Sequence, residues 1–297
     1  MRIQYSPYSL IKKTRLNALD QLATQDGALI KLIDEDNNWG VADLCPWPSL
    51  GDLSLIDEIN FMGNLYQRAL ELAADDLQAR KEKKSLLQNK WIVNNTLVSN
   101  YRAFDYQNPK HVGRTLKIKG DRDIEALASL LNVIHVNNKI RLDFNGVLNK
   151  LEFQSFLQLL SNKERIEYIE DPTAYDVDNW ILWNKKIPLA SDFVLGHEGF
   201  TFKIVKPSRE KIQNGTRFTI TSAMDHPVGV AHALRYAQSF ARNVSGLLTL
   251  GFYEPTPFQS AFAIRNDVEL NFSAKALGEF GIGMTSELNE LGWKNSI

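Results

Sequence analysis

The sequence predicts a (β/α) barrel, and two observations support that fold class. From about residue 90 onward, short apolar runs alternate with longer amphipathic segments such as 122–131, 150–160 and 228–242. Repeated strand-then-helix units are typical of a parallel sheet. The apolar runs number eight, which fits a closed barrel better than an open sheet. They span residues 91–98, 115–119, 140–144, 166–169, 187–190, 202–205, 218–220 and 247–252.

The N-terminal part does not show this regular alternation of strands and helices. Residues 5–12 read as a strand that Pro7 would place at a sheet edge. The apolar runs 27–33 and 39–44 are separated by an Asp/Asn cluster and predict a hairpin. Two closely spaced prolines make 45–48 a loop, and apolar spacings of three and four predict more than one helix within 56–87.

One barrel unit is too short. A βαβ crossover needs at least about 10–12 residues including its helix. The link between Ala190 and Phe202 has no room for a strand exit, a full helix and a return. We therefore expect the fifth helix to be truncated or replaced by a loop.

Composition excludes several classes of protein. The 34 Lys and Arg residues balance 35 Asp and Glu residues, so no basic excess is present to meet nucleic acid. The single cysteine, Cys45, allows no internal disulfide and is best explained as a packed thiol. No apolar run approaches the ~20 residues that span a bilayer, and the opening segment lacks a leader pattern. We expect a cytoplasmic protein that takes a small molecule.

Charged residues end five consecutive predicted strands in the order Lys119, Asp143, Glu170, Asp192 and Lys206. In a barrel of this kind, the catalytic groups lie at the carboxyl ends of the strands. Three carboxylates in one pocket repel each other unless a cation neutralises them. Ligands that are all oxygen select a hard ion, so we expect Mg²⁺, with Mn²⁺ as an alternative.

The two lysines then lie on either side of the carboxylates. A substrate carboxylate on the metal would sit between Lys119 and Lys206, so one amine could remove the adjacent proton while the ion holds the developing charge. Lys117 shares a strand face with Lys119, because side chains alternate along a strand. A neighbouring ammonium would favour the neutral amine that a general base requires.

At these residues the sequence resembles the enolase superfamily, and within it the muconate-lactonizing branch that contains the o-succinylbenzoate synthases. The matching segments are Lys117-Ile118-Lys119, Asp143-Phe144-Asn145, Glu170-Asp171-Pro172, Ala190-Ser191-Asp192 and Val205-Lys206-Pro207-Ser208. Sites of this superfamily use a Lys or His base with magnesium. The resemblance implies a modified (β/α)7β TIM-type barrel with an N-terminal α+β capping domain. The cap would take residues 1–88 and be completed by about 254–297, and the barrel would take 89–253.

The resemblance also implies roles for single residues. Asp143, Glu170 and Asp192 would be the magnesium ligands, with Lys117 and Asn145 as supporting residues. Lys119 would take the α-proton and then protonate the departing hydroxyl, while Lys206 would stay protonated and stabilise the enediolate. Ser222 would contact a substrate carboxylate, and His226 is more often a loop or capping histidine than an acid or base.

The implied activity is that of a magnesium-dependent lyase of menaquinone synthesis. It would dehydrate 2-succinyl-6-hydroxy-2,4-cyclohexadiene-1-carboxylate. An N-acylamino acid racemase, a dipeptide epimerase or a cycloisomerase on the same scaffold is the first alternative, since two lysines flanking a carbon also suit racemisation. A non-catalytic barrel acting as a scaffold is an alternative of another class. The sequence leaves the oligomeric state open.

Overall fold

The computed structural model describes residues 1–13, 22–192, 198–212 and 217–296. It divides into two compact units. The first unit holds Met1–Val93, Lys206–Ile212 and Ile220–Ile297, and the second holds Asn94–Val205 and Gln213–Thr219. The division expected from the sequence, 1–88 with about 254–297 against 89–253, stays a prediction about domains. None of the described helices combines the length and the apolar composition needed to cross a membrane.

The first unit begins with a three-stranded antiparallel sheet in the order β1-β2-β3. Its strands are β1 (Arg2–Ile11), β2 (Thr24–Ile33) and β3 (Trp39–Leu44). The expected hairpin is confirmed, because Ile33 pairs with Trp39 and Ala28 with Leu44. The turn forms because the Asp34 carboxylate accepts a hydrogen bond from the Asn38 backbone N–H at 2.8 Å. The strand predicted around Pro7 is also confirmed, at the edge of this sheet.

Two helices follow, α1 (Leu55–Asn60) and α2 (Asn64–Lys81), as the periodicity predicts. The apolar face of α2 packs on β2 and β3 in one buried cluster. Gly40 permits the close approach, because a Cβ there would lie 2.1 Å from the backbone nitrogen of Leu77. Asp76 is fully buried and accepts hydrogen bonds from the backbone of Val41 and Ile282, so α2 is tied both to β3 and to the C-terminal segment.

The rest of the first unit is built mainly from C-terminal elements. A second antiparallel sheet has the order β12-β13-β4. Its strands are β4 (Ile92–Val93), β12 (Phe262–Arg265) and β13 (Glu269–Phe272). The helices are α6 (Pro227–Phe240), α7 (Ala274–Leu277) and α8 (Thr285–Asn289), with short 3-10 turns at Pro48–Leu50, Leu250–Phe252 and Pro257–Ala261.

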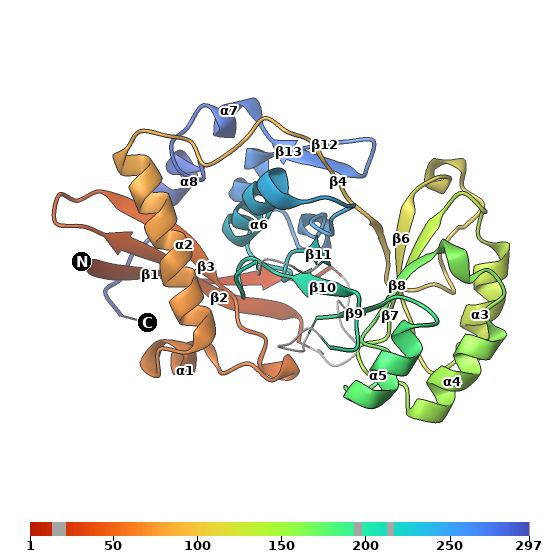
Figure 1. Ribbon diagram of the computed structural model, residues 1–297. Helices are drawn as coiled ribbons and strands as arrows, with labels where there is room; N and C mark the ends of the chain where they lie inside the picture. The colour runs from red at the N-terminus through yellow and green to blue at the C-terminus, as the bar shows by residue number, and fades with distance from the viewer. Residues whose placement is uncertain (14–21, 193–197, 213–216, 297) are drawn as a thin grey trace. The chain divides into compact units, whose positions relative to one another are not determined.

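The second unit carries a curved sheet in the order β11-β10-β9-β8-β7-β6-β5, of which β5 to β10 run parallel. Its strands are β5 (Thr96–Val98), β6 (Thr115–Lys119), β7 (Lys139–Asp143), β8 (Ile166–Glu170), β9 (Leu189–Ser191), β10 (Phe202–Val205) and β11 (Arg217–Ile220). The helices α3 (Ile124–Val133), α4 (Lys150–Leu159) and α5 (Val177–Asn184) cover one face of β6 to β8 (Figure 1). Two 3-10 turns lie at Pro109–His111 and Lys163–Arg165.

Side-chain caps start each of these three helices. Asp123 and Asp176 accept hydrogen bonds from backbone N–H groups in the first turns of α3 and α5. Asn149 and Glu152 form a reciprocal capping box at α4. Parallel strands that alternate with helices along the chain are the architecture of a (β/α) barrel. The fold class predicted from the sequence is therefore confirmed.

Two predicted strands are wrong in detail. The run 91–98 is split, because β4 pairs with β13 whereas β5 pairs with β6. Asn94 and Asn95 separate the two strands, and both are buried. The run 247–252 is not a strand; it ends in a 3-10 turn in which Phe252 N–H donates to the Thr249 carbonyl. The apolar pattern there reflects burial alone, which serves a turn as well as a strand.

The short link between β9 and β10 agrees, in its described part, with the expectation that the fifth helix is truncated or replaced by a loop. No helix occurs at residues 192 and 198–201, which are its described part, and residues 193–197 lie outside the described residues.

Candidate active site

Three charged side chains lie beside one another at the carboxyl ends of neighbouring strands. Lys119 at the end of β6 pairs with Asp143 of β7, and Asp143 pairs with Glu170 of β8. Residues paired across parallel strands face the same side of the sheet. Asp143 and Glu170 are 1% and 2% exposed. The strand register thus brings together three residues that the sequence separates by about fifty positions.

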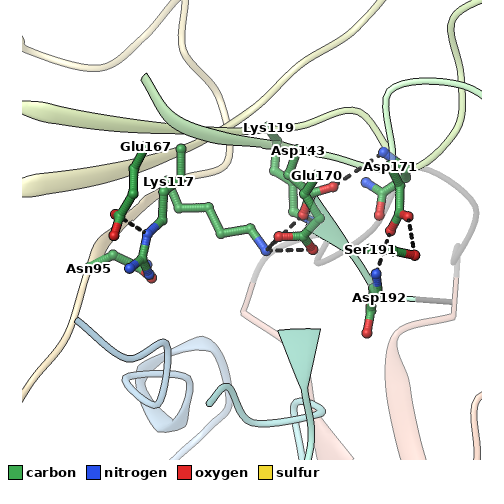
Figure 2. Close-up of polar contacts among 11 residues, drawn as sticks. Asn95, Lys117, Lys119, Asp143, Glu167, Glu170, Asp171, Ser191 and Asp192 are labelled. Atoms are coloured by element: carbon green, nitrogen blue, oxygen red, sulfur yellow. Dashed lines mark hydrogen bonds and ion pairs between the residues drawn. The ribbon is translucent and has the colours of Figure 1, made fainter. Parts of the chain in front are cut away.

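Lys117 joins this group from two residues earlier on β6. Its Nζ atom lies 2.8 Å from Glu170 Oε1, 2.7 Å from Glu170 Oε2 and 2.9 Å from Asp143 Oδ2. Lys119 Nζ donates to the same Asp143 oxygen at 2.5 Å. Figure 2 shows Lys117 extended along the sheet toward Glu170. One oxygen of Asp143 therefore accepts from two ammonium groups, in a place with little water to screen them.

Burial and the neighbouring charges shift these groups in different directions. Burial alone would raise the pKa of Asp143, but the ammonium groups of Lys117 and Lys119 hold that pKa below its ordinary value. For Glu170, burial and the Asp143 charge raise the pKa to about 7, against the opposing effect of Lys117. Burial disfavours the Lys117 ammonium, yet Asp143 and Glu170 raise its pKa well above the usual range. Asp143 therefore keeps its negative charge to lower pH than Glu170 does.

Asp192 comes next in the same unit, directly after β9. One oxygen from each of Glu170, Asp171 and Asp192 lies within 4.8 Å of the others. Carboxylate oxygens are the donors that Mg²⁺ and Mn²⁺ prefer. The residues fit a divalent cation, because three carboxylate oxygens that lie this close together repel one another unless a cation neutralises them. Asp143, Glu170 and Asp192 as the ligand set stay a prediction.

Asp171 is a member of the site that sequence reasoning passed over. It is 4% exposed, and its carboxylate accepts from Ser191 Oγ and from the Asp192 backbone N–H, each at 3.1 Å. Its position inside Glu170-Asp171-Pro172 was visible in the sequence, but the pattern alone indicates a turn. Its partners on the next strand become apparent only when β8 and β9 are aligned.

The remaining predicted residues take varied places. Asn145 follows β7 with φ 48°, and its backbone N–H donates to Asp143 Oδ1 at 3.2 Å. Lys206 follows β10 and belongs to the first unit, where its carbonyl accepts from Arg209 N–H. Its role opposite Lys119 stays a prediction.

Two further residues lie in the first unit. The Ser222 hydroxyl pairs with Thr249 Oγ1 at 2.6 Å and accepts from the Met224 N–H, so its role in substrate binding stays a prediction. His226 is the N-cap of α6, and its Nδ1 accepts from the Val228 N–H. The interpretation of His226 as a capping residue is confirmed. The predicted packed thiol of Cys45 is buried.

The first unit also holds a buried acidic pair to which sequence reasoning assigned no role. Asp43 accepts from the Tyr8 hydroxyl at 2.6 Å and from the His226 backbone N–H at 2.9 Å. Asp225 accepts from Ser208 Oγ at 3.2 Å. Burial and the Asp225 charge raise the pKa of Asp43 well above its ordinary value, and burial raises the pKa of Asp225. These bonds link β1 and β3 to the start of α6.

Comparison with known proteins identifies the family. Residues 3–79 match the model of the N-terminal domain of O-succinylbenzoate synthase. The chain is 30% identical over 328 residues to an o-succinylbenzoate synthase of Bdellovibrio bacteriovorus, covering 99% of this chain and 98% of the relative. The chain belongs to the o-succinylbenzoate synthase family. The resemblance stated from its motifs is confirmed.

Solved structures agree with this fold. A muconate lactonizing enzyme from Pseudomonas fluorescens, complexed with muconolactone, has a TM-score of 0.74 at 14% identity and covers 95% of both chains. The L-Ala-D/L-Glu epimerase from Bacillus subtilis has a TM-score of 0.76 at 16% identity, covering 95% of this chain and 98% of that one. At such identities the likeness shows the fold alone. O-succinylbenzoate synthases are enzymes of the lyase class.

Proposed function

We propose that this protein is an o-succinylbenzoate synthase, which dehydrates 2-succinyl-6-hydroxy-2,4-cyclohexadiene-1-carboxylate in menaquinone synthesis. The observation that carries the proposal is the ion-paired group of Lys117, Lys119 and the buried carboxylates of Asp143 and Glu170 at the ends of three parallel strands. The full-length similarity to an o-succinylbenzoate synthase supports this choice of reaction.

The lysines perform the proton transfers. Lys119 takes the proton next to the substrate carboxylate, and the resulting ammonium returns it to the departing hydroxyl, so that water leaves. Lys206 stays an ammonium and stabilises the negative charge that develops on the carboxylate. Lys117 holds Asp143 and Glu170 in place, since its Nζ contacts both carboxylates. A positioned base of this type typically contributes about 10²–10⁴-fold to the rate.

Asp143, Glu170 and Asp192 would hold the divalent cation, Mg²⁺ or Mn²⁺. When bound, the cation supplies positive charge that attracts the substrate carboxylate and stabilises the charge developing on it. Asp143 also pairs with Lys119, so the residue that would bind the ion keeps the base close to its working position. A location in the cytoplasm stays a prediction.

The direct test is conversion of the cyclohexadiene substrate by purified protein with MgCl₂, followed by the change in absorbance as the ring becomes aromatic. We expect turnover by the wild type and a loss of at least about 10²-fold in Lys119→Ala. Lys139→Ala is the matched control, because Lys139 is an exposed lysine at the opposite end of β7. A Lys119→Ala rate near that of the wild type would rule out Lys119 as the base.

The same preparation separates the alternatives. Exchange of the α-deuterium of N-succinylamino acids without dehydration would identify a racemase, and release of a dipeptide epimer would identify an epimerase. Absence of both turnover and divalent-ion binding would favour the scaffold.

A further inference from the structure

The third carboxylate of the site depends on a residue that is not among the predicted ligands. Asp192 lies directly after the last residue of β9, and its carbonyl accepts a hydrogen bond from Lys203 Nζ at 2.7 Å. Asp171 Oδ2 accepts from the Asp192 N–H at 3.1 Å, and Asp171 Oδ1 accepts from the Ser191 hydroxyl at the same distance. Both bonds are visible in Figure 2. A single buried carboxylate thus holds two consecutive residues at the point where β9 ends.

Asp171 is itself fixed from two sides. Its backbone N–H donates to the Ala190 carbonyl at 3.0 Å, and its carbonyl accepts from the Gly146 N–H at 2.6 Å. These bonds connect the end of β8 to β9 and to the loop after β7. The side chain therefore starts from a backbone that three strand ends hold in place.

The backbone angle explains the type of residue. Asp171 has φ 39°, in the left-handed region that Asp and Asn tolerate better than other side chains that carry a Cβ. Pro172 follows and restricts the chain further. An aspartate here meets two demands at once, because it accepts the conformation and offers two acceptor oxygens to β9.

Proximity alone would also allow Asp171 to be a metal ligand, since its oxygen lies within 4.8 Å of oxygens of Glu170 and Asp192. The hydrogen bonds favour another role. Each of its oxygens already accepts from a donor of β9 or the residue after it. Residues that orient metal ligands typically act in this way, by hydrogen bonding to the ligand or its backbone.

We propose that Asp171 is a positioning residue, which holds the backbone of Asp192 so that the Asp192 carboxylate meets the divalent cation beside Glu170. This inference rests on the proposed function, because it needs the metal site. It assigns the acidic residue of Glu170-Asp171-Pro172 to orienting a ligand and not to binding the ion.

The test is the affinity for Mg²⁺ and Mn²⁺, measured by titration calorimetry on the full chain without substrate. Asp171→Ala removes both acceptors, and we expect about 10–100-fold weaker binding. Ser191→Ala removes one of the two hydrogen bonds, and we expect a smaller loss of up to about tenfold. Asp171→Asn is the decisive variant. Its amide oxygen can accept from the Asp192 N–H while its amide NH₂ donates to Ser191 Oγ, so we expect affinity within about threefold of the wild type.

A control separates positioning from general loss of stability. Asp176→Asn alters another aspartate that accepts from a backbone N–H, at the exposed start of α5. It should leave metal affinity unchanged even where the melting temperature falls. Unfolding is recorded for each variant without metal.

The outcomes are distinct. If Asp171→Asn binds as weakly as Asp171→Ala, the residue acts as a ligand or through its charge, and the proposal is wrong. Wild-type affinity in both Asp171→Ala and Ser191→Ala also overturns it. Should Asp171→Ala fail to fold, a loss of affinity of about tenfold or more in Asp171→Asn, or wild-type affinity in Ser191→Ala, overturns the proposal. If the wild type binds neither ion, the proposed function itself is wrong. If the wild type and Asp171→Ala bind the ion equally well, only the positioning role of Asp171 is wrong.

Discussion

Replacing Lys117 by methionine should destabilise the protein by more than an ordinary substitution. The side chain is 12% exposed, and its Nζ lies within 3 Å of oxygens on Asp143 and Glu170, whose side chains are 1% and 3% exposed. Methionine keeps much of the apolar stem but leaves two buried carboxylates without this cation. Removing one partner of a buried ion pair costs about 3–5 kcal/mol. We expect the lower end, because the pKa of Glu170 is already about 7 and this carboxyl can take up a proton.

The assay is urea unfolding at pH 7, with and without saturating MgCl₂. Lys139→Met is the control, since this lysine is exposed at the start of β7 and should change the free energy of unfolding by less than about 0.5 kcal/mol. Mg²⁺ should stabilise Lys117→Met more than the wild type, because ligand binding adds to the stability of the folded state and the ion meets one ammonium group fewer there. A loss below about 1 kcal/mol in Lys117→Met without Mg²⁺ would show that the ion pairs are not stabilising and would refute the reasoning.

The remaining predictions concern the first unit. Gly40→Ala should lower the melting temperature and cost at least about 1–3 kcal/mol, because the new Cβ would lie 2.1 and 2.2 Å from backbone atoms of α2; an unchanged melting temperature would contradict this packing. Burial lowers the pKa of His226 and His232 to about 3, so only the unfolded chain binds protons at these rings between about pH 6.5 and 3. The free energy of unfolding should decrease as the pH is lowered through that window, by up to about 2.7 kcal/mol per pH unit for the two rings together. In His232→Gln, the urea midpoint should depend less steeply on pH. Burial and Asp225 raise the pKa of Asp43, so the folded protein keeps a proton that the unfolded chain releases above about pH 4. This contribution to stability declines as pH rises, and Asp43→Asn should flatten the decline above about pH 4; an identical profile would show that folded Asp43 does not keep this proton.

The sequence alone could not reveal that Asp43 and Asp225 form a buried acidic pair. Asp43 is an acidic residue inside an apolar strand, which is a signal in itself, but Asp225 lies about 180 positions later. Nothing in either segment indicates the other. The two meet because β3 and the start of α6 pack in the same unit, as the bond from His226 N–H to Asp43 shows.

The sequence by itself determined the type and order of most elements and the residues that end the strands. Alternation of apolar runs and amphipathic segments reports local burial, which is why β6, β7, β8 and β10 lie close to their predicted bounds. The same local signal could not separate a strand from a buried turn at Leu250–Phe252. It also could not divide β4 from β5, because strand partners decide that division.

Only the tertiary structure decided which charged groups share a site. Parallel register places Lys119, Asp143 and Glu170 in a row. By contrast, the two hydrogen bonds that Asp171 accepts from Ser191, the last residue of β9, and from Asp192 have no trace in local sequence. Electrostatic energy depends on distance and burial, and neither is encoded in spacing along the chain. The pKa of Glu170 therefore follows from the fold, although the residue that carries it could be found from the sequence.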